Sequence, residues 1–218
     1  MPTQTALSTL TADSDRGRKA TDLFRHAYNN AALDEERAQF LNENRAFPAE
    51  LRRLIEEYSM PVKAPEGGRI LVVRVPVNPG REWQEAINAA GPNTGSDWAV
   101  RKVGDQYPPQ SGEPKEREII LVNFGKTIPD TQYALDWAKP YGLSPEPPRG
   151  VFAIGEHKPQ LHRELKRSVV VVVSPVPCSF GDLRLVPGVW WNDAERSAFL
   201  YWFDNEWSDY YWFAFSRE

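Results

Sequence analysis

Residues 190–215, WWNDAERSAFLYWFDNEWSDYYWFAF, hold the densest aromatic cluster of the chain. Twelve of the chain's 26 aromatic residues and five of its eight tryptophans fall in this stretch. Two segments of it, residues 199–203 and 211–215, place every second large ring on one side, as a β-strand does. A short polar loop separates them, so the pattern predicts a β-hairpin.

A two-stranded hairpin cannot bury both of its faces by itself. The predicted inward face carries the phenylalanines and tyrosines, and the opposite face carries tryptophans. Because Trp and Tyr are the usual anchors of protein interfaces, the second face and the polar loop form a predicted binding site. Its residues are Trp190, Trp202, Asp204, Asn205, Glu206, Trp207, Asp209 and Trp212.

The preceding sequence predicts an α+β fold. We expect a disordered tail at residues 1–15, then a module of three short amphipathic helices at 16–60. A mixed, mainly antiparallel sheet domain follows at 66–218 and is clearest at 118–218. Its predicted strands are 69–77, 118–124, 168–176 and 183–191 before the hairpin, and its predicted helices are 81–91, 129–141 and about 157–165. The Pro- and Gly-rich residues 92–115 fit a long ordered loop or a flexible excursion.

Composition narrows the classes of function. The chain has 218 residues, a formal net charge of −4 and one cysteine, Cys178, so it cannot form an intramolecular disulfide. The weak negative charge argues against a nucleic-acid footprint over the whole chain. The longest apolar run, residues 169–173, is too short for a bilayer span, and the first residues lack a signal-peptide pattern. We therefore expect a cytoplasmic protein without membrane association.

Motifs for metal or nucleophilic chemistry are weak. Asn192 and Asp193 follow Trp191 in a W-N-D triplet, which suits either a calcium site or, with more support, a turn. His157 and His162 are five residues apart, whereas zinc pairs on a helix prefer three or four, so a solvated helix face is expected. Cys178 has no local base and is expected to be a buried hydrophobe. No metal or other cofactor is predicted.

Several segments resemble a family of short, uncharacterised bacterial proteins, with the likeness covering about residues 17–218. They include WQEAINAAGPNTGSDWAV (83–100), IILVNFGKTIPDTQYALDWAKPYGL (119–143) and LYWFDNEWSDYYWFAFSR (200–217), the last with a W-F-D-x-x-W motif. No activity is assigned to that family, so the resemblance implies architecture alone. A fainter likeness to C-type-lectin-like and formylglycine-generating-type domains implies a C-type-lectin-like arrangement, although the paired catalytic cysteines of some members are missing.

The leading hypothesis is a non-catalytic binding or adaptor protein that recognises another protein through the aromatic hairpin and its loop. A first alternative is a nucleic-acid-associated accessory factor that uses the basic first helix, with Arg16, Arg18, Lys19 and Arg25. A second alternative is an enzyme with a carboxylate site near residues 204–209, where Asp204, Glu206 and Asp209 lie.

Overall fold

The computed structural model describes residues 15–44, 46–52, 62–96 and 98–217. The chain divides into two compact units, Met1–Glu56 and Glu57–Glu218, here called the N-terminal and C-terminal units. The predicted tail lies outside the described residues, apart from Asp15, which opens the first helix. No helix within the described ranges is long and apolar enough to cross a bilayer.

The N-terminal unit is helical, as predicted. Helix α1 spans Asp15–Asn30 and α2 spans Glu35–Glu43, and a further helical segment covers residues 47–52. The Asp34 carboxylate accepts a hydrogen bond from the Arg37 backbone N–H at 2.8 Å and so caps the N-terminus of α2. Residues 53–58 of the predicted third helix lie outside the described residues.

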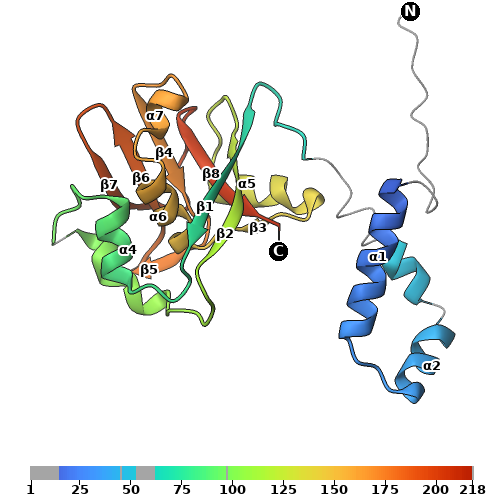
Figure 1. Ribbon diagram of the computed structural model, residues 1–218. Helices are drawn as coiled ribbons and strands as arrows, with labels where there is room; N and C mark the ends of the chain where they lie inside the picture. Colours follow the sequence, from blue (N-terminus) through green and yellow to red (C-terminus); the bar gives the residue numbers. More distant parts are fainter. Residues whose placement is uncertain (1–14, 45, 53–61, 97, 218) are drawn as a thin grey trace, which may run out of the picture. The chain divides into compact units, whose positions relative to one another are not determined.

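The C-terminal unit contains one mixed, mostly antiparallel sheet (Figure 1). Its order is β1-β2-β8-β4-β6-β5, with β3 on β8 and β7 on β6. Among the described strands, β4 and β8 form the one parallel pair. The strands are β1 Arg69–Val77, β2 Lys115–Asn123, β3 Ser144–Pro145, β4 Val169–Val173, β5 Cys178–Phe180, β6 Leu183–Asn192, β7 Arg196–Trp202 and β8 Tyr211–Ser216. The predicted α+β class is therefore confirmed.

Helices connect and cover these strands. They are α4 Trp83–Ala90, η1 Ala99–Gln106, α5 Thr131–Ala138, η2 Lys139–Tyr141, α6 Pro148–His157 and α7 Leu161–Glu164. The helix expected at about 157–165 is present only as the four residues of α7. The longer helix α6 lies before it and starts at Pro148, where proline suits a first turn. Residues 92–115 are largely an ordered connection that includes η1.

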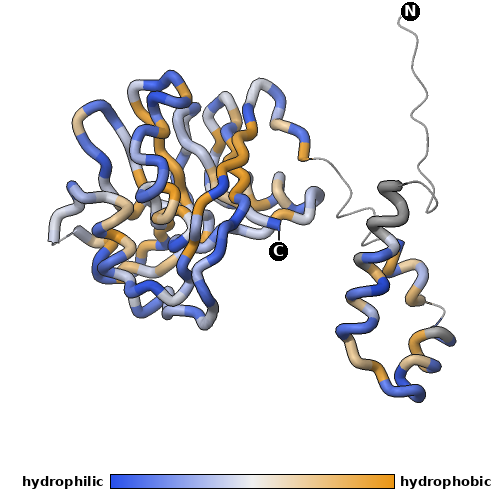
Figure 2. Tube along the Cα trace, viewed as in Figure 1, coloured by the Kyte–Doolittle hydropathy of each residue, from blue (hydrophilic) through white to orange (hydrophobic). Residues whose placement is uncertain are grey.

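Strand alternation divides the C-terminal unit into two cores, one on each face of the sheet. One core joins the sheet to α4 and α6, and the other joins it to α5. On β8, Trp212 and Ala214 enter the first core, while Phe213 and Phe215 enter the second. Figure 2 shows the hydrophobic residues gathered along the central strands.

The predicted aromatic hairpin is wrong. Strand β7 forms a hairpin with β6, in register from Leu185↔Trp202 to Trp191↔Arg196, and β8 lies instead between β2 and β4. The connection between β7 and β8 crosses the sheet and pairs with the segment before α5, through reciprocal backbone bonds between Ile128 and Trp207. Alternation sets the face of each residue but says nothing of which strand lies beside it.

Candidate functional site

Two of the predicted binding residues belong to the core. Trp207 is fully buried, and its Nε1 donates to Thr131 Oγ1 at 3.1 Å. Trp212 is 2% exposed and packs beneath the α4–α6 layer. Neither ring is available to a partner, so their proposed role in recognition is corrected to one in packing.

The polar loop between β7 and β8 is held by separate contacts. Asp204 forms an ion pair with Arg184, and Asn205 Nδ2 donates to the Tyr201 hydroxyl at 3.3 Å. Asp209 lies 3.6 Å from Arg167, at a different place on the unit. Glu206 is exposed. Asp204 and Asp209 therefore neutralise different cations, and the carboxylate site of the enzyme alternative stays a prediction.

The remaining two predicted tryptophans lie on opposite faces of the sheet. Trp202 is 52% exposed and pairs in register with Leu185, whose side chain belongs to the α4–α6 core. Trp190 is half-buried and packs against the core on the α5 face.

Trp190 lines an open groove on the α5 face of the sheet. The groove has a volume of about 650 Å³, within the range of known ligand sites. Its walls come from β4, β6, β7, the start of β8 and the residue before η1. We call it the aromatic groove, and its residues are Trp98, Arg167, Ser168, Val169, Val171, Trp190, Phe199, Tyr201, Asp209, Tyr210 and Tyr211.

The groove floor depends on a cross-strand pair in the β6–β7 hairpin. Phe199 lies opposite Gly188, and a Cβ on that glycine would stand 2.7 Å from Phe199 Cε1 and 2.8 Å from the Val172 carbonyl oxygen. Glycine thus makes room for the ring to lie against the backbone of β6. The Phe199 ring contacts the Tyr201 ring along the same strand, with the two ring centroids 6.4 Å apart.

Three tyrosines, Tyr201, Tyr210 and Tyr211, contribute hydroxyl groups to the groove. Burial raises the pKa of Tyr211, and the hydroxyls of Tyr210 and Tyr201 raise it further. The Tyr210 and Tyr211 rings are 4.5 Å apart, and Tyr201 lies 5.7 Å from Tyr211. Tyr211 is therefore a neutral donor and acceptor beside an apolar floor. The Arg167–Asp209 ion pair supplies charge at the rim of the groove.

The W-N-D segment forms a turn. Asn192 Oδ1 accepts hydrogen bonds from the backbone N–H groups of Ala194 and Glu195, at 2.8 and 2.7 Å, and so closes the β6–β7 connection. Asp193 instead approaches His162 and Arg163, at 3.4 and 3.7 Å. No group of three His, Cys, Asp or Glu side chains in the described part of the chain is arranged for a metal ion.

The expectation for the two histidines is half wrong. His157 is exposed beside Glu156, but His162 is 4% exposed and lies in α7, which packs on β4 and β6. A short helix pressed onto the sheet buries a residue that a longer free helix would leave in water.

Cys178 is buried, as predicted. Burial raises the pKa of its thiol, while a hydrogen bond with Tyr107 acts in the opposite direction. The Tyr107 hydroxyl donates to the Val176 carbonyl at 2.9 Å, and burial raises its pKa as well. A protonated thiol beside a protonated phenol is a poor nucleophile.

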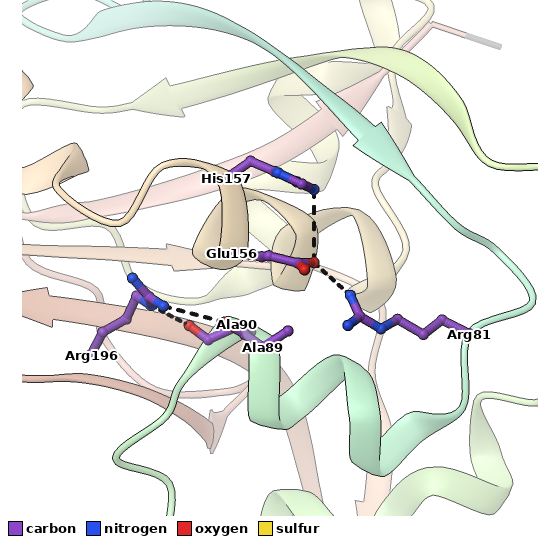
Figure 3. A network of polar contacts seen from close by, with 6 residues as sticks. All are labelled: Arg81, Ala89, Ala90, Glu156, His157 and Arg196. Atoms are coloured by element: carbon purple, nitrogen blue, oxygen red, sulfur yellow. Dashed lines mark hydrogen bonds and ion pairs between the residues drawn. The ribbon is translucent and has the colours of Figure 1, made fainter.

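A polar network lies at the contact between α4 and α6 (Figure 3). Three of its residues, Arg81, Glu156 and His157, line a smaller cavity of about 220 Å³. Glu156 Oε2 lies 2.5 Å from Arg81 Nη1 and 3.7 Å from His157 Nε2. Arg196 donates to the carbonyls of Ala89 and Ala90 and so caps the end of α4. Burial lowers the pKa of Arg196, and the nearby Glu156 charge raises it. The network joins two helices and the β7 strand, which is a structural role.

A third cavity contains a buried carboxylate at the start of α6. Glu146 is fully buried, and its Oε2 lies 3.4 Å from Arg117 Nη2. A Cβ at Gly150 would lie 1.9 Å from Glu146 Oε1, so the glycine allows the carboxylate to approach the positive end of the helix. We interpret this pair as part of the fold.

The basic residues of the nucleic-acid alternative are only partly described. The side chains of Arg16, Arg18 and Lys19 lie outside the described residues, although their backbone belongs to α1. Arg25 is exposed and pairs with Asp22 at 2.7 Å. That alternative stays a prediction.

Only Trp190 and Asp209 of the predicted binding residues line the aromatic groove. Trp98 stands alone in a Pro- and Gly-rich segment, and Arg167 carries no recognisable motif. Their only sequence signal was an isolated tryptophan and a cation directly before a buried strand.

Comparison of the chain with protein-family models, curated proteins and solved structures gave no match in any of the three. The resemblance to the bacterial family and the C-type-lectin-like arrangement therefore stay predictions.

Proposed function

We propose that this protein is a non-catalytic binding or adaptor protein that holds an apolar segment of another protein in the aromatic groove. The observation that carries the proposal is the groove itself, an open hollow of about 650 Å³ lined by six aromatic rings. Most of the rings come from the aromatic C-terminal stretch, but they reach the groove from three strands rather than from one hairpin.

The chemistry of the groove suits a protein partner. Tryptophan, tyrosine and arginine are the side chains that most often anchor protein interfaces. Trp98 and Tyr210 are exposed at the groove, while Phe199 forms a buried floor, so an incoming side chain meets rings on several sides. The Arg167–Asp209 pair offers both signs of charge at the rim and so can orient the partner segment.

Selection from a displayed library of random peptides tests this proposal, followed by affinity measurement on the full chain. We expect selected peptides to carry two or more apolar residues. Trp98→Ala should weaken their binding at least tenfold, on the order of the loss at an interface anchor.

Trp202→Ala is the matched control, because this tryptophan is as exposed as Trp98 but projects from the other face. Equal losses in the two variants would contradict the groove as the binding site. Failure to select any peptide, together with tight binding of small aromatic compounds, would contradict recognition of a protein.

A further inference from the structure

The N-terminal unit presents large apolar side chains to solvent. Phe24 and Tyr28 are one helical turn apart on α1, so they share a face, and each is almost half exposed. Phe40 on α2 is 74% exposed, and Phe47 is also exposed. Among the residues of this unit whose exposure is described, none is buried.

So small a helical unit needs a further source of stability. Units of this size bury a smaller fraction of their surface than larger domains do, and many of them depend on disulfides, metals or association with another chain. The one cysteine of the chain is Cys178, so a disulfide within this unit is impossible. Association would remove the four aromatic rings from water and stabilise the helices that carry them.

The charges of the two helices favour a second copy as the partner. Helix α1 carries four basic and two acidic residues, whereas α2 carries three acidic residues and one basic residue. In a contact with twofold symmetry, a surface on one copy meets the same surface on the other in reversed order. The basic α1 of each copy can then face the acidic α2 of the other, which gives opposite charges on both sides of the contact.

We propose that the N-terminal unit is a self-association module, and that the aromatic faces of its helices pack against the same unit of a second copy of this chain. The full chain is then a dimer with two copies of the C-terminal unit.

Sedimentation equilibrium of the full chain at micromolar concentrations tests this proposal. The expected result is a reversible dimer with twice the mass of the 24.8-kDa chain. Phe40→Glu should weaken the dimer at least tenfold, since it places a charge among rings that become buried. Because Phe40 is so exposed in its own unit, the helix content by circular dichroism should be unchanged when both proteins are monomeric.

Two further variants make the result specific. Phe40→Leu keeps an apolar side chain and should keep the dimer. Tyr133→Glu introduces the same charge at an exposed ring of the C-terminal unit and should leave the dimer intact. A chain that is monomeric throughout the concentration range, or a dimer that Phe40→Glu leaves unchanged, would overturn the proposal.

Discussion

Trp207 connects the crossing between β7 and β8 to the start of α5. Its backbone N–H donates to the Ile128 carbonyl at 2.9 Å, and its Nε1 donates to Thr131 Oγ1. Its ring lies 4.9 Å from Tyr201 and 5.3 Å from Phe213. One side chain therefore ties the connection to the α5 face, next to the floor of the aromatic groove.

We expect Trp207→Ala to destabilise the C-terminal unit by about 3–5 kcal/mol, the usual loss for removing a fully buried Trp. Denaturant unfolding followed by circular dichroism measures the change. Glu206→Ala, at the exposed neighbouring position, should change stability by less than about 0.5 kcal/mol. Similar small changes in both variants would mean that Trp207 is not part of the core.

Burial of Trp207 was not predictable from its neighbours. Asp204, Asn205, Glu206, Ser208 and Asp209 surround it in sequence and are typical of an exposed loop. The contact that buries it comes from residues near 128–131, more than seventy positions earlier. Side-chain direction within β8 was predictable, because alternation separates Trp212 from Phe213 whatever lies beside the strand.

The β6–β7 hairpin is the element that shapes the aromatic groove. Its two strands are joined by a turn that Asn192 closes, and its inner surface holds the Gly188–Phe199 pair. The neighbouring strand β4 supplies Val169 and Val171 from the same face. The groove thus depends on the register of three adjacent strands.

Gly188→Ala should destabilise the unit by about 1–3 kcal/mol, because the new methyl group meets a ring and a backbone carbonyl that are both fixed by the sheet. The midpoint of thermal unfolding should fall accordingly. Gly95→Ala serves as the control, since a Cβ there meets no atom within 4 Å. If Gly188→Ala were neutral, Phe199 would not lie against β6 as described.

The local sequence pattern predicted the bounds of several strands correctly, but it did not predict which strands pair with each other. The bounds of β1 agree with the predicted residues 69–77, and β4 lies within the predicted apolar run, because each has a recognisable pattern of its own. The pairing of β8 with β2 and β4 is a long-range property, and two adjacent alternating segments gave a plausible but wrong hairpin. Short elements such as β5 and α7 were missed or misplaced because four or fewer residues carry almost no periodic signal.

The C-terminal unit buries one cysteine thiol and two tyrosine hydroxyls in their protonated form. Burial raises the pKa values of Cys178, Tyr107 and Tyr211 above their ordinary values. As the pH rises, the unfolded chain releases these protons before the folded chain does. Their contribution to stability is therefore complete below the ordinary pKa values, about 8.5 for Cys and 10 for Tyr, and is lost above them.

We accordingly expect the free energy of unfolding to fall above about pH 9, with a slope near 1.4 kcal/mol per pH unit for each group that titrates. Denaturant titrations between neutral and strongly alkaline pH measure this slope. Tyr211→Phe should reduce the slope above about pH 10. A slope equal to that of the unaltered chain would contradict the burial of the Tyr211 hydroxyl.

The division into a helical region and a sheet region could be inferred from composition and periodicity. The set of residues that line the aromatic groove could not be inferred in this way. The aromatic stretch led to a predicted binding site, and one of the residues of that site, Trp190, lines the aromatic groove. Trp98 and Arg167 come to the groove from distant parts of the sequence, and only the assembled sheet brings them together. Trp207 and Trp212 were predicted to bind a partner on the same grounds as Trp190, but both are buried in the two cores.

Fluorine NMR of the full chain labelled with 5-fluorotryptophan tests the aromatic groove most directly, with a peptide selected as described above. On peptide addition, the Trp98 and Trp190 signals should shift in a saturable way, because both rings line the groove. The signals of Trp202, on the opposite face, and of the buried Trp212 should stay in place. Shifts at Trp202 without shifts at Trp98 and Trp190 would place binding elsewhere and contradict the proposed function.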